Sequence, residues 1–217
     1  PAIYVNLGTG LAVAIICGGR VVSGANGAAG EIGYNLRQLS DLEPNQSKRV
    51  VLEEVVSGMG LSASGRLATG QEMSAAEVFA HETDDARLAD VMERFVDELC
   101  FHLANLAVAI DPSRIAVGGG MVRSWSRLEA PIRHALEAAV PFPPELVVGA
   151  YPFDAPLVGA LNLALAAVSE TADGIHDDNF AIVGQAALPP HNGVPAKRRA
   201  EEHNKVKERS QTTRLTK

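Results

Sequence analysis

Residues 2–24 read AIYVNLGTGLAVAIICGGRVVSG and carry the clearest strand pattern of the sequence. Two aliphatic, β-branched runs are separated by the glycine turn at 8–10, and a second turn at Gly18 and Gly19 follows. The pattern predicts strand, turn, strand, turn and strand. Because a domain seldom opens in the middle of a sheet, we expect preceding strands to be missing or to lie in another piece of polypeptide.

The next segments have the spacing of helices. Val, Leu and Met recur with a helical period over 51–67 and 74–79, and Ser74 with Glu77 forms a capping-box pattern. A longer helix is predicted over 85–111, ending before Pro112. His102 lies on its apolar face, where a core histidine is the simpler interpretation.

Strands and helices then alternate. A strand is predicted at 114–117 before three glycines, then a helix over 126–140, a strand over 145–151 and a helix over 155–168. The alternation predicts an α/β fold, a sheet with helices laid on it, and ligands of such sheets bind at the carboxyl ends of strands. Both glycine clusters, 8–10 and 118–120, follow strands.

The composition favours a globular body with a polar tail. The 217 residues are 47% hydrophobic but only 5% aromatic, which suits helices packed on a sheet. Formal net charge is −7, yet the segment from Pro189 holds eight Lys or Arg against three Glu, leaving a net −12 before it. An acidic body argues against binding duplex nucleic acid. We expect a folded lobe over 1–168 and a polar, disordered tail over 169–217.

The two cysteines, Cys17 and Cys100, lie in apolar runs without neighbouring ligands, so we expect buried, reduced thiols. The apolar run at 11–17 is too short to cross a bilayer and follows no basic segment. These features predict a cytoplasmic protein that is not membrane-bound.

Two glycine turns and two carboxylates are the candidates for ligand binding. Gly8, Thr9 and Gly10 would let backbone N–H groups approach a phosphate, although such a turn also closes plain hairpins. The turn at 118–120 would accept a flat ligand, or simply join strand to helix. Glu31 and Glu53 could hold vicinal sugar hydroxyls, although a helix start also favours an acid at Glu53.

Four motifs in order carry a family resemblance: LGTGLAVAIICGGRVVSGANGAAGEIGY, LEEVVSG, NLAVAIDPSRIAVGGGMV and DAPLVGALNLAL. From Ile3 to Val168 the chain resembles the carboxyl-terminal lobe of the ROK family, which groups bacterial sugar kinases with sugar-responsive repressors. The resemblance implies an actin-like ATPase fold, of the ribonuclease-H-like type, with a mixed sheet and flanking helices.

The resemblance also implies site residues and cofactors. Gly8, Thr9 and Gly10 match the loop that cradles the ATP phosphates, and Gly118, Gly119 and Gly120 match the turn that holds the adenosine. Glu31 matches the acid of the sugar motif, Tyr34 stands in that motif, and Glu53 matches a second sugar contact. The family's kinases use ATP with Mg²⁺ and transfer the γ-phosphoryl group to a sugar hydroxyl that an aspartate deprotonates.

Three departures from the family pattern stand out. Tyr34 replaces the usual histidine, and residues 44–51 contain no cysteine where the family has a zinc cluster, so we predict no zinc. Ala12 and Ala14 stand where glycines are common. The catalytic aspartate belongs to an amino-terminal lobe that these residues do not contain, so no catalytic residue is assigned.

The sequence leaves three functions open. The leading one is a lobe of an ATP-dependent hexokinase of glucokinase type, inactive by itself, with a hexose as ligand and a homodimer as the expected assembly. The alternative is the sugar-sensing domain of a ROK-type repressor, which would meet nucleic acid only through an upstream DNA-binding domain. A truncated product without function is the third.

Overall fold

The structure of the protein is a computed structural model that describes residues 1–43 and 49–173. Its sheet has five strands in the order β3-β2-β1-β4-β5. They comprise β1 (Ala2–Leu7), β2 (Leu11–Cys17), β3 (Arg20–Val21), β4 (Arg114–Gly118) and β5 (Glu145–Val148). The first three are antiparallel, whereas β4 runs parallel to β1 and β5 parallel to β4. The predicted mixed sheet with flanking helices is confirmed.

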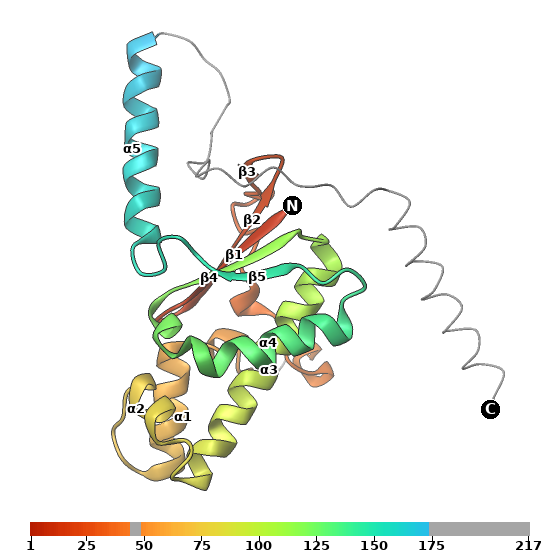
Figure 1. The fold of residues 1–217 in the computed structure, drawn as a ribbon, viewed down its shortest axis with the longest axis vertical. Helices are drawn as coiled ribbons and strands as arrows, with labels where there is room; N and C mark the ends of the chain where they lie inside the picture. The colour runs from red at the N-terminus through yellow and green to blue at the C-terminus, as the bar shows by residue number, and fades with distance from the viewer. Residues whose placement is uncertain (44–48, 174–217) are drawn as a thin grey trace, which may run out of the picture. The chain divides into compact units, whose positions relative to one another are not determined.

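The described residues form five α-helices: α1 (Gly58–Thr69), α2 (Ala75–His81), α3 (Ala86–Ile110), α4 (Trp125–Ala139) and α5 (Ala155–Asp173). Figure 1 shows α3 and α4 beside the sheet, whereas α5 lies apart from it. Short 3-10 helices connect the elements: η1 (Ile32–Tyr34), η2 (Leu39–Leu42), η3 (Leu52–Glu54) and η4 (Gly120–Ser124). The helix pair α3 and α4 shares one hydrophobic core with the sheet.

Alternation along the central strand explains why only one face is packed. In β1 the side chains of Ile3, Val5 and Leu7 are buried, whereas those between them are half-buried. Successive strand side chains point to opposite faces, so these three meet the helices. Phe95, Leu99 and Leu103 from α3 and Leu128, Ile132 and Leu136 from α4 join them in one core cluster.

Helix boundaries follow their capping residues. Ser57 accepts the Gly60 N–H and begins α1, and Ser74 and Glu77 form the predicted capping box of α2. The helical period read from Val51 was therefore placed too early, because the α-helix begins only at Gly58. Residues 52–54 form η3 instead, separated from α1 by the extended N-cap, Ser57.

The predictions for the two cysteines and for the polar tail have different outcomes. Cys17 is exposed at the last residue of β2, so its predicted burial is wrong. Cys100 is half-buried, and burial raises the pKa of its thiol to about 11. The predicted tail begins inside α5, and residues 174–217 lie outside the described part of the chain, so its disorder stays a prediction.

Helix α5 is apolar yet exposed. Leu157, Leu161, Leu163 and Leu165 are each more than half exposed. Despite this composition, no helix within residues 1–43 and 49–173 is both long and apolar enough to cross a bilayer.

Candidate functional site

The turn Gly8–Thr9–Gly10 lies at the centre of the candidate site. It joins β1 to β2 through a short hairpin in which Leu7 pairs with Leu11. The start of α1 holds this turn, because the Gly58 N–H donates to the Gly8 carbonyl at 2.8 Å and the Met59 N–H to the Thr9 carbonyl at 3.1 Å. Thr9 itself is exposed.

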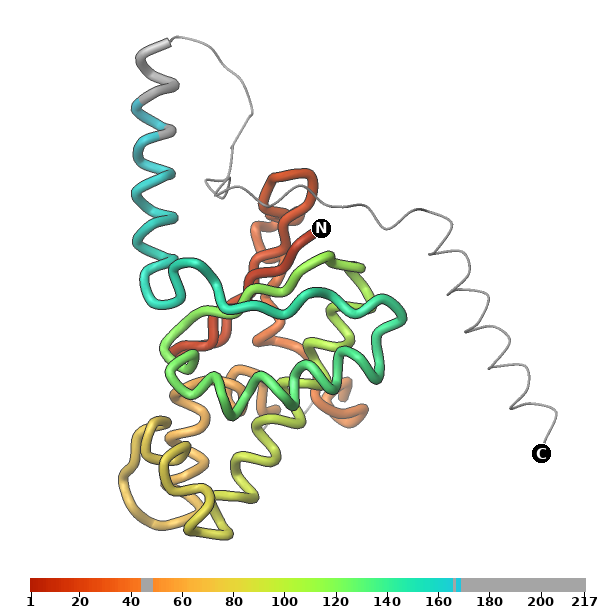
Figure 2. The backbone as a smooth tube through the Cα atoms, viewed as in Figure 1, coloured from red at the N-terminus to blue at the C-terminus, as the bar shows by residue number. Residues whose placement is uncertain are grey.

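The second glycine turn lies beside the first. Because β4 runs parallel to β1, with Gly118 opposite Asn6, both strands end at the same edge of the sheet. Figure 2 shows the backbone passing from that edge into η4 and α4. The topology therefore brings the two predicted glycine clusters together, as expected for a ligand site at the carboxyl ends of strands.

A pocket of about 570 Å³ opens between these turns and the helices α1 and α2. Gly8, Thr9 and Gly120 form its floor on the sheet side. Apolar side chains line the far wall, and two cations, Arg66 and Arg123, lie among its lining residues. The apolar part comprises Met59, Ala63, Met73, Ala75, Ala76, Phe79 and Met121.

The three glycines of the second turn have different surroundings. Gly118 ends β4, and a Cβ there would collide with the hydroxyl of Tyr4, whose side chain packs against this glycine. Gly119 has φ of 92°, which favours glycine, and its N–H donates to the Pro152 carbonyl at 2.6 Å. Only Gly120 of the three lines the pocket.

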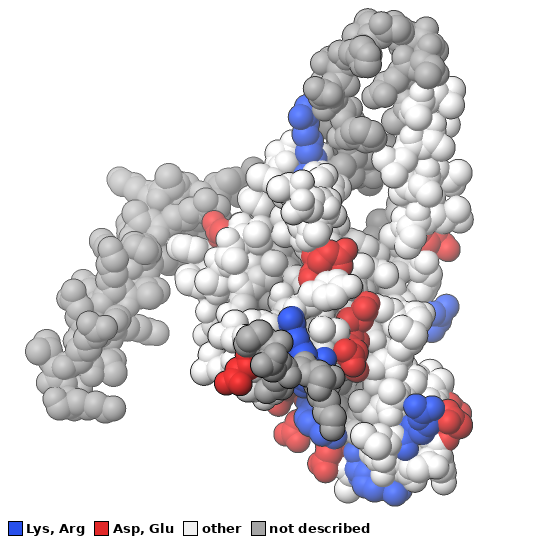
Figure 3. Space-filling view, turned by 180° about the vertical axis from the view of Figure 1, so that it is seen from behind, with Lys and Arg blue, Asp and Glu red and all other residues white. Residues whose placement is uncertain are grey.

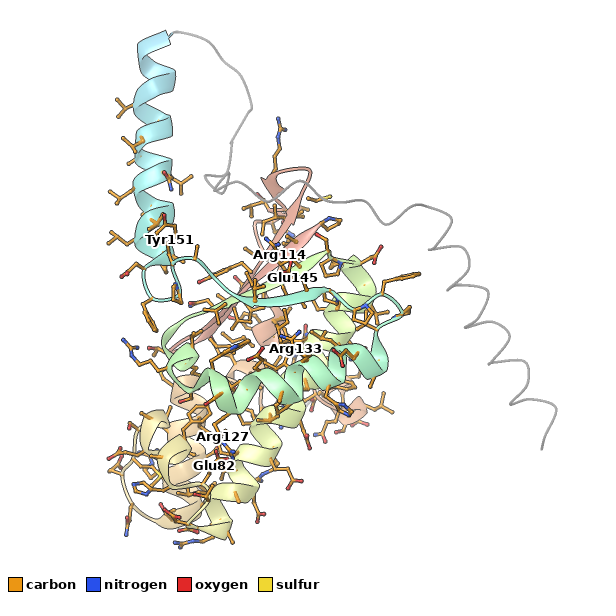
Figure 4. All side chains as sticks on the ribbon, viewed as in Figure 1. Glu82, Arg114, Arg127, Arg133, Glu145 and Tyr151 are labelled. Atoms are coloured by element: carbon orange, nitrogen blue, oxygen red, sulfur yellow. The ribbon has the colours of Figure 1, made fainter. Side chains whose placement is uncertain are left out.

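Polar contacts fix the helix α2 that forms one wall of the pocket. Glu82, at the end of α2, is 9% exposed and accepts a hydrogen bond of 2.5 Å from Arg127 Nε of α4. Figure 4 shows the two side chains meeting between these helices. The pair connects the pocket wall to the helix that packs on the sheet.

Glu53 lies on the other side of the glycine turn. It belongs to η3 and accepts the Leu11 N–H through Oε1 at 2.8 Å. Gly33 of η1 packs on it, since a Cβ there would lie 3.2 Å from Glu53 Cβ. The structure therefore brings Glu53 to the turn predicted to bind phosphate.

Glu31 directly precedes η1 and Tyr34 is its last residue, and both are exposed. The Tyr34 carbonyl accepts a hydrogen bond from Arg49 Nη2 at 2.5 Å, which holds the loop after η1. Because η1 packs against η3 through Gly33, the two predicted sugar acids lie at neighbouring elements. Among the described residues, Glu53 accepts one hydrogen bond, from the Leu11 N–H through Oε1.

A polar network on α3 supports this loop. Arg37 Nε donates to Glu98 Oε1 and Oε2 at 3.0 and 2.9 Å, and Asn35 Nδ2 lies 3.2 Å from His102 Nδ1. His102 is 4% exposed, as expected of a core histidine. Burial lowers its pKa and so does Arg37, whereas the Glu98 carboxylate opposes both.

The described residues contain no group of three or more His, Cys, Asp or Glu placed to hold a metal ion. Residues 44–48, within the segment that corresponds to the family's cysteine cluster, lie outside the described part. The prediction of no zinc therefore rests on the sequence, which has no cysteine there.

Charges on the described surface are mixed. Figure 3 shows Lys and Arg interspersed with Asp and Glu over the face that it presents, rather than a field of basic side chains. That distribution agrees with the acidic composition of the folded part.

Sequence reasoning missed the pocket walls. Met59, Ser62 and Arg66 face the pocket from one side of α1, and Met73 and Phe79 do so from α2 and the segment before it. The i, i+3, i+7 spacing in α1 is a usable signal, but it fits an ordinary buried or exposed helix face equally well.

The chain is similar to known proteins over most of its described length. A glucokinase from Halalkalibacterium halodurans is 32% identical over 152 residues, which cover 63% of this chain and 46% of the relative. The chain thus spans about half the length of that protein.

Solved structures have the same fold. A ROK family glucokinase from Streptomyces griseus in complex with glucose and AMPPNP aligns with a TM-score of 0.61 at 24% identity, covering 75% of this chain and 59% of that one. A ROK family transcriptional regulator, homologous to an E. coli protein, aligns at 0.55 and 23% identity, covering 68% and 41%.

The ROK family model matches residues 1–167, which include every described strand and all four motifs. The mixed five-stranded sheet with its helices is the fold that the resemblance implied. The chain belongs to the ROK family.

Proposed function

We propose that this chain is the nucleotide-binding lobe of a ROK-type sugar kinase and provides half of its hexose site. The observation that carries the proposal is the pocket between the two glycine turns and helices α1 and α2. Its apolar wall suits a purine ring, and its glycine floor and two arginines suit phosphates. A similar protein, the Streptomyces glucokinase, was solved with AMPPNP and glucose.

Different pocket residues would contact the base and the phosphates of the nucleotide. Met73, Phe79 and Met121 would contact the base, and the exposed Thr9 hydroxyl and the turn's backbone would approach the phosphates. Arg123 lies over the Phe153 ring at 4.2 Å, which holds its guanidinium near the turn. Its charge would offset that of the phosphates.

Mg²⁺ would accompany ATP, but the described part of this chain offers few ligands for the ion. Among the described lining residues, Glu72 is the one carboxylate, and it pairs with Arg66 at 3.3 Å. Magnesium prefers oxygen ligands and is commonly held through phosphates and one or two carboxylates. Bound there, the ion would neutralise phosphate charge, and its protein ligands would come from outside these residues.

Glu31 and Glu53 would accept hexose hydroxyls at the neighbouring side of the turn, with Tyr34 beside them. No aspartate of this sequence occupies the context of the family's catalytic base. We therefore expect the chain alone to bind ligands without transferring phosphate, and a second lobe to supply the base that deprotonates the sugar.

A sugar-sensing role is the second candidate, supported by the fold shared with a ROK family transcriptional regulator. Calorimetric titration with D-glucose tests the sugar site, with Glu31→Gln against Glu43→Gln as a matched surface control. We expect the first substitution to weaken hexose binding about tenfold or more, since a charged hydrogen bond is worth about 1.5–3 kcal/mol. Equal affinity in both variants would reject Glu31 as a ligand.

Binding of glucose without any affinity for AMPPNP would favour the sensor over the kinase lobe. Binding of both would favour the kinase lobe.

A further inference from the structure

We propose that Glu53 is a positioning residue that couples the hexose side of the site to the nucleotide side through the turn Gly8–Thr9–Gly10. This inference rests on the proposed function, because it presumes that both ligands bind here. What it adds is a physical connection between the two, made by one side chain.

The carboxylate of Glu53 is divided between two tasks. Oε1 accepts the N–H of Leu11, the residue directly after the turn, at 2.8 Å. Within the part of the chain that the structure describes, Oε2 has no hydrogen-bond partner, so it remains available to a hydroxyl. One carboxylate can thus hold the turn and meet a sugar.

Close packing makes the carboxylate sensitive to movement. A Cβ added at Gly10 would lie 2.5 Å from Glu53 Oε1, and one at Gly33 would lie 3.2 Å from Glu53 Cβ. The side chain is therefore confined between the turn and η1. A ligand that pulls on Oε2 cannot move the carboxylate without moving the Leu11 amide or the turn.

The turn passes this constraint to the nucleotide pocket. Its Gly8 and Thr9 carbonyls accept the Gly58 and Met59 N–H groups at 2.8 and 3.1 Å. Met59 and Gly58 line the pocket, as do Gly8 and Thr9 themselves. Consecutive hydrogen bonds thus join Glu53 to the pocket floor and to the first turn of α1.

Coupling of this kind is reciprocal, so each ligand must change the other's affinity by the same factor. The test titrates the 217-residue chain with D-glucose, with and without saturating AMPPNP. We expect AMPPNP to change the glucose affinity of the wild type by about fivefold or more. The ratio of the two affinities is the readout, because a loss of stability alone would not alter it.

Gly10→Ala tests this connection, because its methyl group would lie against the Glu53 carboxylate. Gly159→Ala in α5 is the control, because a Cβ there would meet no described atom within 4 Å. We expect the ratio to fall close to one in Gly10→Ala and to persist in Gly159→Ala.

Glu53→Gln gives a second measurement should Gly10→Ala fail to fold, since it keeps an acceptor for the Leu11 N–H. In Glu53→Gln the ratio should move part of the way toward one, and in Glu53→Met it should come close to one. Glu54→Gln should leave the ratio as in the wild type. An unchanged ratio in Gly10→Ala or in Glu53→Met overturns the inference and leaves the proposed function standing. A wild type that binds neither ligand overturns both.

Discussion

Arg37 and Glu98, 61 positions apart, form a two-pronged hydrogen bond in which Arg37 Nε donates to both carboxylate oxygens at 3.0 and 2.9 Å. Arg37 also gives its backbone N–H to Asp41 Oδ2 at 3.0 Å. Arg37 therefore connects the loop after η1 to α3 through Glu98, and it closes the loop internally through Asp41.

Replacing Arg37 with Met should destabilise the protein by about 1–2 kcal/mol, because it leaves a three-quarters buried Glu98 without its main partner. Arg133→Met is the control: its pair with Glu129 is a more exposed i, i+4 contact, which is worth only about 0.3–0.5 kcal/mol. Urea denaturation measures both. Equal losses would show that the Arg37 pair does not anchor the loop.

The buried His102 should make stability depend on pH. Its pKa in the fold lies below the ordinary 6.5, mainly because burial disfavours the charged ring. The unfolded chain then binds more protons between the two values, so the unfolding free energy should fall as the pH drops through 6.5. Above that pH the contribution of neutral His102 is complete.

Denaturation curves at pH 7.5 and 5.5 measure this effect. His102→Gln should reduce the difference between the two curves, while the exposed His134→Gln should leave it as in the wild type. The polar and charged groups that face His102 are Asn35, Glu98 and Arg37. If His102→Gln keeps the full difference in unfolding free energy between the two pH values, a group other than His102 causes the pH dependence.

Arg127→Met should cost about 1–2 kcal/mol, since it removes the partner of the buried Glu82. Arg114→Met, which breaks a more exposed pair with Glu145 on neighbouring strands, should cost less than about 1 kcal/mol. Because Glu82 ends α2, the first change should also weaken AMPPNP binding. Thermal melting measures the stability of both variants, and calorimetry measures their affinity for AMPPNP. A loss of AMPPNP affinity in Arg114→Met but not in Arg127→Met would contradict the prediction.

The sequence predicted the fold well because its periodicities are strong. The aliphatic run at residues 2–7 and the apolar stripe on 86–110 supply the buried residues of β1 and α3. Helix α1 was placed too early, since Val, Leu and Met continue a helical spacing through residues that form a 3-10 turn. Local hydrophobic spacing cannot tell the two apart; the cap at Ser57 can.

The site was only partly predictable. Glycines after strands predicted both turns, because glycine readily adopts the backbone conformations that tight turns require. The pocket walls and the Glu53 contact with Leu11 depend on tertiary packing across 42 positions, which no local pattern encodes. Cys17 shows the same limit: an apolar run predicts a strand, but tertiary packing decides which of its residues are buried.

The most direct test of the nucleotide pocket is calorimetric titration of the 217-residue chain with AMPPNP, comparing Ala76→Phe with Ala80→Phe. Both alanines lie on α2 one turn apart and both are exposed, but only Ala76 lines the pocket. We expect the wild type and Ala80→Phe to bind alike and Ala76→Phe to bind about tenfold more weakly or worse, a loss of at least about 1.4 kcal/mol. No binding by the wild type, or equal binding by both variants, would contradict the account.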